Sequence, residues 1–144
     1  MPVAHVLHKK GEWTIAPVDM LVLEFQDRHR RRLFMTCEGG LAFLIDLPRA
    51  AIMRSGDALA LDDGRHIEIA AAAEPLAEII PGTPLEFIRM AYHLGNRHLP
   101  AEILDGSIRI CSDRIIEKMA QRLGARVQGI EAPFEPETAG RGHE

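Results

Sequence analysis

The second half of the chain alternates strand and helix signals in an order that few folds share. Residues 73–80 are typical of a strand, and a strong helix start follows at Thr83 and Pro84. The threonine can cap the first free amides, proline fits the first helical position, and Glu86 completes a capping box. Gly95 is a natural end for this helix. The pattern therefore predicts a strand followed by a helix.

The next segment reads as a short hairpin. Residues 101–104 and 107–111 are strand-like, and Asp105-Gly106 between them is a two-residue turn signal. The chain is thus expected to turn back on itself directly after the first helix.

A second helix is expected after the hairpin. Ser112 or Asp113 can cap its start, and Gly124 ends it. Helical spacing predicts one buried face, formed by Ile115, Ile116, Met119 and Leu123. The apolar stripe of the first helix consists of Leu85, Ile88 and Tyr92, with Ala91 beside it.

A last strand over residues 125–130 completes the order β-α-β-β-α-β, which is the ferredoxin-like arrangement. The first half differs, because strand-like runs there are joined by glycine-bearing turns such as Glu38-Gly39-Gly40 and Asp62-Asp63-Gly64. Pro48 is expected to end one of these strands.

The fold class is accordingly α+β. We expect a small all-β N-terminal domain over residues 1–72, a ferredoxin-like βαββαβ domain over residues 73–131, and a flexible tail over residues 132–144, which is rich in Pro, Gly and Glu.

Composition narrows the function. The formal net charge of −4 argues against nucleic acid as the main partner, and the basic run 28–32 is expected to be a solvated strand or turn. Cys37 and Cys111 form no C-x-x-C pair, so no disulfide framework is indicated. The polar N-terminus and the lack of long apolar runs predict a soluble, cytoplasmic protein without a membrane segment.

Candidate chemical residues are few. The seven histidines form no dense metal motif, and on spacing alone His98 is an ordinary exposed loop residue. No phosphate loop and no nucleophile elbow is present, so the chain is not expected to be an enzyme.

Segment 91–100, AYHLGNRHLP, resembles the signature of the urease accessory protein UreE family of nickel metallochaperones. Further similarity lies in LPR (47–49), RSGD (54–57), LDDGR (61–65) and PFEPE (133–137), so the resemblance covers nearly the whole chain. It implies a β-rich domain of a peptide- or partner-binding type, a ferredoxin-like domain, and a homodimer formed through the latter.

The resemblance also implies a metal site at the dimer axis. His98 from both subunits would bind one Ni²⁺, and tail histidine His143 would supply a further ligand. His93 matches a motif position as either a ligand or a packing residue. The family's secondary site is not expected, because only Cys111 and Asp113 could ligate there. Zinc and copper ions also bind histidine and are expected to compete for such a site.

The function that the resemblance implies is delivery of Ni²⁺ to apo-urease through the accessory GTPase complex. The partners would be a second copy of the chain, that GTPase and the urease apoprotein, with no nucleic acid and no membrane. The alternative is a protein-binding adaptor or chaperone of the same assembly complex that acts without metal.

Overall fold

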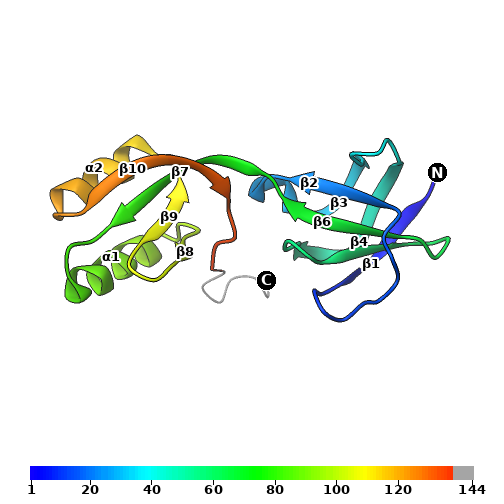
Figure 1. Ribbon diagram of the computed structural model, residues 1–144, viewed down its shortest axis with the longest axis horizontal. Helices are drawn as coiled ribbons and strands as arrows, with labels where there is room; N and C mark the ends of the chain where they lie inside the picture. Colours follow the sequence, from blue (N-terminus) through cyan, green and yellow to red (C-terminus); the bar gives the residue numbers. More distant parts are fainter. Residues whose placement is uncertain (138–144) are drawn as a thin grey trace. The chain divides into compact units, whose positions relative to one another are not determined.

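The computed structural model describes residues 1–137. The chain divides into two compact units, residues 1–72 and the residues from Ala73 onward, and each unit has its own sheet (Figure 1). The first sheet has six strands and the second has four. Both helices of the described residues lie in the second unit, so the α+β class is confirmed.

The first sheet has the spatial order β2-β6-β5-β1-β4-β3. β1 pairs in parallel with β4, and β2 in parallel with β6, while the other neighbours are antiparallel. A single 3-10 turn, η1, joins β2 to β3. The elements are β1 (Val3–His8), β2 (Asp19–Leu23), η1 (Phe25–Arg28), β3 (His29–Thr36), β4 (Ala42–Ile52), β5 (Ala58–Leu61) and β6 (His66–Ala71).

The sequence pattern of the first half predicts strands over residues 20–25, 32–37, 41–47, 57–61 and 66–70. Strand β1 is not among them, yet it lies between β5 and β4 near the middle of the sheet. Of its six residues only Ala4 is buried, so the alternation of apolar and polar side chains is too weak to reveal it. Its place is decided by the two neighbouring strands with which it pairs.

Strand β4 continues through Pro48, where the sequence pattern predicts its end. Arg30 pairs with Ala51 and Arg32 with Asp46, so residues 47–50 form a bulge opposite a single residue of β3. A bulge leaves backbone groups out of the ladder, and a proline without an N–H is therefore tolerated there.

Arg28, the first residue of the basic run, is fully buried, which corrects the expectation of a solvated run. Its Nε donates to the carbonyl of Leu23 at 3.0 Å and its Nη1 to the carbonyl of Met53 at 3.1 Å. A buried charge must be hydrogen-bonded, and these bonds connect the end of β2 with the end of β4.

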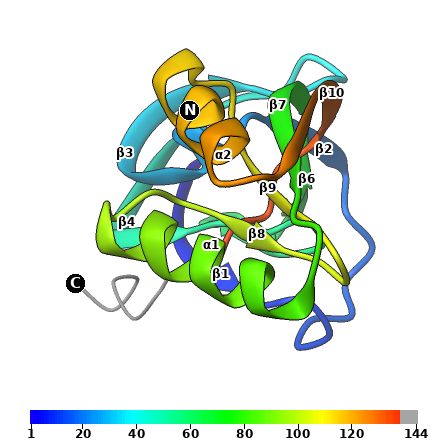
Figure 2. The ribbon, with the colours of Figure 1, turned by 90° about the vertical axis from the view of Figure 1, so that its left-hand side faces the viewer.

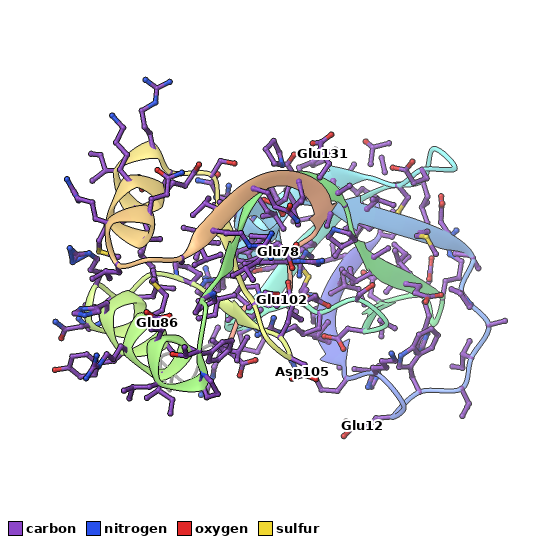
Figure 3. All side chains as sticks on the ribbon, turned by 60° about the vertical axis from the view of Figure 1, so that its left-hand side comes forward. Glu12, Glu78, Glu86, Glu102, Asp105 and Glu131 are labelled. Carbon is purple, nitrogen blue, oxygen red and sulfur yellow. The ribbon has the colours of Figure 1, made fainter. Side chains whose placement is uncertain are left out.

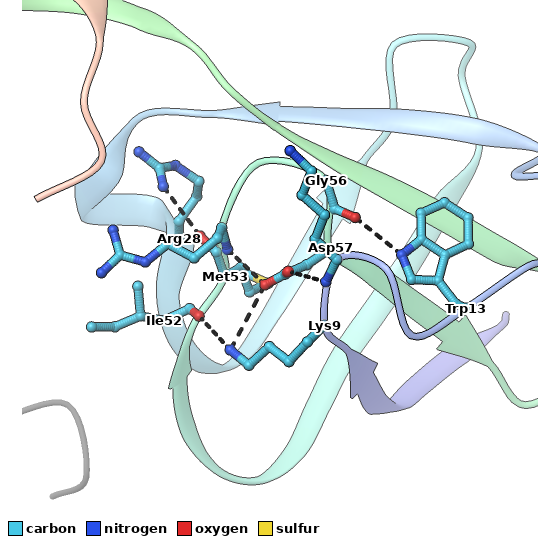
Figure 4. Close-up of polar contacts among 9 residues, drawn as sticks. Lys9, Trp13, Arg28, Ile52, Met53, Gly56 and Asp57 are labelled. Carbon is cyan, nitrogen blue, oxygen red and sulfur yellow. Dashed lines mark hydrogen bonds and ion pairs between the residues drawn. The ribbon is translucent and has the colours of Figure 1, made fainter.

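A second buried charge lies at the turn before β5 (Figure 4). The carboxylate of Asp57 accepts the backbone N–H of Lys10 at 2.9 Å and that of Arg54 at 2.8 Å. The indole of Trp13 donates to the carbonyl of Gly56 at 3.0 Å. These bonds hold the long loop after β1 against the turn.

The second unit has the sheet order β10-β7-β9-β8 with every neighbouring pair antiparallel. This is the strand order of a ferredoxin-like fold, as predicted. Both helices lie on one face of the sheet and share one apolar core with it (Figure 2). The elements are β7 (Ala73–Ile80), α1 (Pro84–Asn96), β8 (Glu102–Ile103), β9 (Ile108–Cys111), α2 (Arg114–Arg122) and β10 (Arg126–Pro133).

The C-terminal segment is part of this fold as far as Glu137, which corrects the expectation of a flexible tail from Ala132. β10 pairs with β7 over its whole length, ending at the pair Pro133 and Ala73. Glu137 then forms an antiparallel bridge with Ala101. Backbone pairing thus orders a segment whose composition favours disorder.

Among residues 1–137, neither α1 nor α2 has the length and apolar character that crossing a bilayer requires.

Candidate metal centre

Helix α1 begins as its capping residues predict. The hydroxyl of Thr83 accepts the backbone N–H of Glu86 at 3.1 Å, and Pro84 occupies the first turn. Glu86 itself lies in that turn (Figure 3). The start of the helix is therefore fixed by local sequence.

The end of α1 differs from the prediction, because Gly95 lies inside the helix and Asn96 is its last residue. The N–H of His98 donates to the carbonyl of Gly95 at 3.0 Å, and the N–H of Leu99 to that of Leu94 at 3.2 Å. These two bonds are those of a Schellman motif. His98 occupies the position that normally holds a left-handed glycine.

The backbone of His98 is consequently strained. Its φ of 57° makes it the one non-glycine residue with a positive φ among residues 1–137. A β-carbon in this region costs roughly 1–2 kcal/mol, which glycine would avoid. Such outliers cluster at functional sites, so the conformation itself marks His98 as a candidate.

The His98 side chain is exposed. Its imidazole has no hydrogen bond, ion pair or ring contact with the residues that the structure describes. Both ring nitrogens are therefore open to a ligand from outside that part of the chain.

The other motif histidine is placed differently. His93 lies in the last turns of α1, is half-buried, and packs edge-on against Tyr92 with 5.8 Å between ring centroids. This contact fits the packing role considered for His93.

Four further histidines belong to the first unit, and one of them is the exposed His29 at the start of β3. His5 Nδ1 lies 2.9 Å from the carbonyl of Asp46, and His8 stacks on His66 with ring centroids 5.5 Å apart. Across residues 1–137, no three or more His, Cys, Asp or Glu side chains gather in a group that could hold a metal ion. A metal ion held at His98 would therefore need ligands from outside the described part of one chain.

A helix cap occupies the segment in which Cys111 and Asp113 were considered as ligands of a secondary site. The carboxylate of Asp113 accepts the N–H groups of Ile115 and Ile116 at 3.0 and 3.2 Å. Cys111 is exposed at the end of β9. Asp113 is thus engaged in capping α2.

The C-terminal segment is bonded to Ala101 and Glu102, which follow the His98 loop in the chain. The N–H of Glu137 donates to the carbonyl of Ala101 at 2.7 Å, and the N–H of Glu135 donates to the carboxylate of Glu102 at 3.2 Å. His143, the other predicted ligand, lies outside the described residues.

An apolar stripe on α1 faces outward. Leu85, Ile88 and Tyr92 are 54%, 64% and 69% exposed, while the core-facing side of the helix carries Met90 and Leu94. A hollow of about 490 Å³ borders this stripe beside Ile88. A single copy of the chain leaves this surface uncovered within the described residues.

The open face of the second sheet carries an ordered carboxylate. The hydroxyl of Ser107 donates to Glu78 at 2.8 Å, and this bond, with those from Gln128 and the charge of Arg109, lowers the pKa of Glu78. Figure 3 shows Glu78 and Glu102 on strands of this sheet. Both carboxylate oxygens of Glu78 thus accept hydrogen bonds from neighbouring segments of the sheet.

The sequence motif indicates His98 as a candidate ligand but does not reveal its backbone conformation. Local sequence gives no sign of this conformation, because the left-handed position is normally a glycine and the nearby Gly95 lies inside the helix. Helical spacing also placed Ile115 and Leu123 on a buried face, whereas they are 77% and 42% exposed, and Ile116 with Ala120 forms the buried face of α2.

Two family models match the chain. Residues 2–72 match the N-terminal domain of the UreE urease accessory protein, and residues 74–144 match its C-terminal domain. The Urease accessory protein UreE of Bradyrhizobium sp. (strain BTAi1) is 57% identical over 125 residues, covering 87% of this chain and 61% of that protein. The protein of the same name from Beijerinckia indica subsp. indica is 48% identical over 128 residues, covering 89% and 74%.

The chain spans about three fifths of the length of several of these relatives, with shares of 61%, 60% and 62% for three of them.

Proposed function

The chain belongs to the urease accessory protein UreE family, and on that premise we propose that it is a cytoplasmic nickel carrier that delivers Ni²⁺ to apo-urease. Delivery passes through the accessory GTPase of the assembly complex. The protein acts as a carrier and not as a catalyst, because its task is to bind and release the ion.

The observation that carries this proposal is the exposed His98 in a left-handed conformation. The fold tolerates a strained histidine where glycine would be favoured, which is expected when the side chain has a function. The C-terminal end of a helix also carries partial negative charge, so a cation bound beyond α1 is favoured there.

One imidazole is a poor metal site, and a second copy of the chain supplies another. In a two-fold symmetric dimer the same residue meets itself at the axis. The outward-facing stripe of Leu85, Ile88 and Tyr92 supports an interface along α1, the helix that ends at His98. We therefore propose a homodimer with Ni²⁺ held by both copies of His98.

We also propose His143 as an additional ligand. Because Glu137 pairs antiparallel with Ala101, the described chain ends in the direction of residues 100, 99 and 98. The six residues from Glu137 to His143 can span at most about 20 Å. The tail histidine is therefore within reach of His98.

A site with so few protein ligands suits a carrier. Imidazole is a borderline ligand that accepts nickel, and open coordination positions let a receiver bind the ion before the donor releases it. Zinc and copper ions also accept imidazole, so they are expected to compete for the site.

The proposal is tested by nickel titration calorimetry together with the mass of the protein in solution. The wild type is expected to bind one Ni²⁺ per dimer, and His98→Ala is expected to lose tight binding. His29→Ala, which removes another exposed histidine at the start of β3, is the matched control and should bind as the wild type does.

Unchanged nickel affinity in His98→Ala would refute the proposal. If urease components bind equally well with and without nickel, and equally well to the wild type and His98→Ala, the metal-independent adaptor would be favoured instead. Because a protonated imidazole cannot coordinate a metal, affinity should also fall between neutral and mildly acidic pH.

The contribution of the tail is tested separately with His143→Ala. This variant should keep the dimer and bind nickel more weakly than the wild type. An unchanged affinity would remove His143 from the site without affecting the proposal for His98.

A further inference from the structure

The cap at the end of α1 fixes the backbone of His98 on both sides. The N–H groups of His98 and Leu99 are bonded to the carbonyls of Gly95 and Leu94. The ligand and its successor are thus tied to the last turn of a thirteen-residue helix.

The side chain of Leu99 anchors the same cap. It packs against the apolar core of the second unit, the cluster to which the fully buried Leu94 belongs. An apolar contact between these two positions commonly accompanies a Schellman motif. Leu99 therefore anchors the turn to the core, while the side chain of the preceding residue, His98, is exposed.

These contacts act before any metal arrives. The hydrogen bonds and the anchor fix the direction of the His98 Cα–Cβ bond, so fewer conformations are lost when the imidazole coordinates an ion. A site on a rigid element is also more accurate than one on a free loop.

We propose that the α1 cap is a positioning device for the nickel ligand and that Leu99 is its positioning residue. The inference rests on the proposed function, because it concerns the affinity that His98 provides. In a symmetric dimer any change in the cap displaces both His98 imidazoles, so it affects both protein ligands of the nickel site.

Nickel titration of Leu99 variants tests the proposal, at a temperature where circular dichroism shows each variant folded. Leu99→Ala should bind nickel about 10- to 100-fold more weakly, as is usual when a residue supporting a metal ligand is lost. Leu99→Met keeps the volume and should restore near-normal affinity. Leu99→Val should fall between them and serves if the alanine variant does not fold.

Met119→Ala is the matched control. Met119 packs against the same core from α2, away from the cap, and its truncation is expected to destabilise the unit to a similar degree. It should leave nickel affinity unchanged. An equal loss of affinity in Met119→Ala, or none in Leu99→Ala, would overturn the positioning role.

A stability measurement tests the strained cap independently. His98→Gly should melt a few degrees above His98→Ala, because glycine takes the left-handed conformation without strain. Equal melting temperatures of the two variants would contradict the strain assigned to the His98 backbone. If His98→Ala kept its nickel affinity, the proposed function would fail. If His98→Ala lost nickel affinity while the Leu99 variants kept it, the positioning inference alone would fail.

Discussion

The proposed dimer interface can be broken with one charge on α1. Ile88 lies in the middle of the outward-facing stripe and is 64% exposed in a single copy. Ile88→Asp places a carboxylate on this surface without touching the core of the second unit. The fold of each copy should therefore survive while association is weakened.

The size of the effect follows from the exposed fraction. Full burial of such a side chain stabilises by about 1.5–3 kcal/mol, so burying the exposed part contributes about 1–2 kcal/mol per copy. The two-fold axis doubles this to about 2–4 kcal/mol. The dimer dissociation constant should rise about 30- to 700-fold, before the desolvation of the aspartate adds to it.

Sedimentation equilibrium over a range of concentrations measures this constant. The matched control is Ile115→Asp, the same change at an isoleucine of α2 that is 77% exposed. The control should associate as the wild type does. A wild-type dissociation constant in Ile88→Asp, with circular dichroism showing it folded, would refute the assignment of the α1 stripe to the interface.

Three further predictions concern the stability of the units. Arg28→Met should lower the free energy of unfolding by about 2–5 kcal/mol in urea titrations, because buried carbonyls lose their donor; a loss under 1 kcal/mol would contradict this. Asp113→Ala should cost about 1 kcal/mol through loss of the α2 cap, and an unchanged urea midpoint would argue against that role. Hydrogen bonding by Ser107 lowers the pKa of Glu78 below its ordinary value of 4.5, so the stability that the carboxylate adds is present above that pH and lost as pH falls through the folded-state pKa. The difference in melting temperature between wild type and Glu78→Gln should therefore shrink below pH 4.5, and a constant difference would refute the assignment.

Most helix and strand boundaries of the second unit could be predicted from the sequence, because residues close to each boundary fix it. Thr83 with Pro84 starts α1, and Asp113 caps α2, each through bonds to residues within three positions. The turn at Asp105-Gly106 likewise closes a hairpin between adjacent strands, with Gly106 at a φ of 85°. Signals of this kind do not depend on the rest of the fold.

Fewer features of the first unit could be predicted from the sequence, because its strands pair with partners far along the chain. β1 pairs with β4, some forty residues later in the chain, and its own sequence alternates too weakly to show that. The burial of Arg28 depends on carbonyls supplied by the end of β2 and by Met53, directly after β4, so a run of basic residues gave no sign of it.

The sequence by itself determined the family, the order of elements in the second unit and His98 as the candidate ligand, because these depend on motifs and short-range signals. Only the tertiary structure decided which apolar residues of the helices face the core, since Ile115 and Leu85 have the same character as the buried Ile116 and Leu94. It also decided that α1 closes on His98 rather than Gly95, because Leu99 must reach the core that the sheet provides. The candidate ligand came from the sequence, and its fixed, strained and exposed placement came from packing.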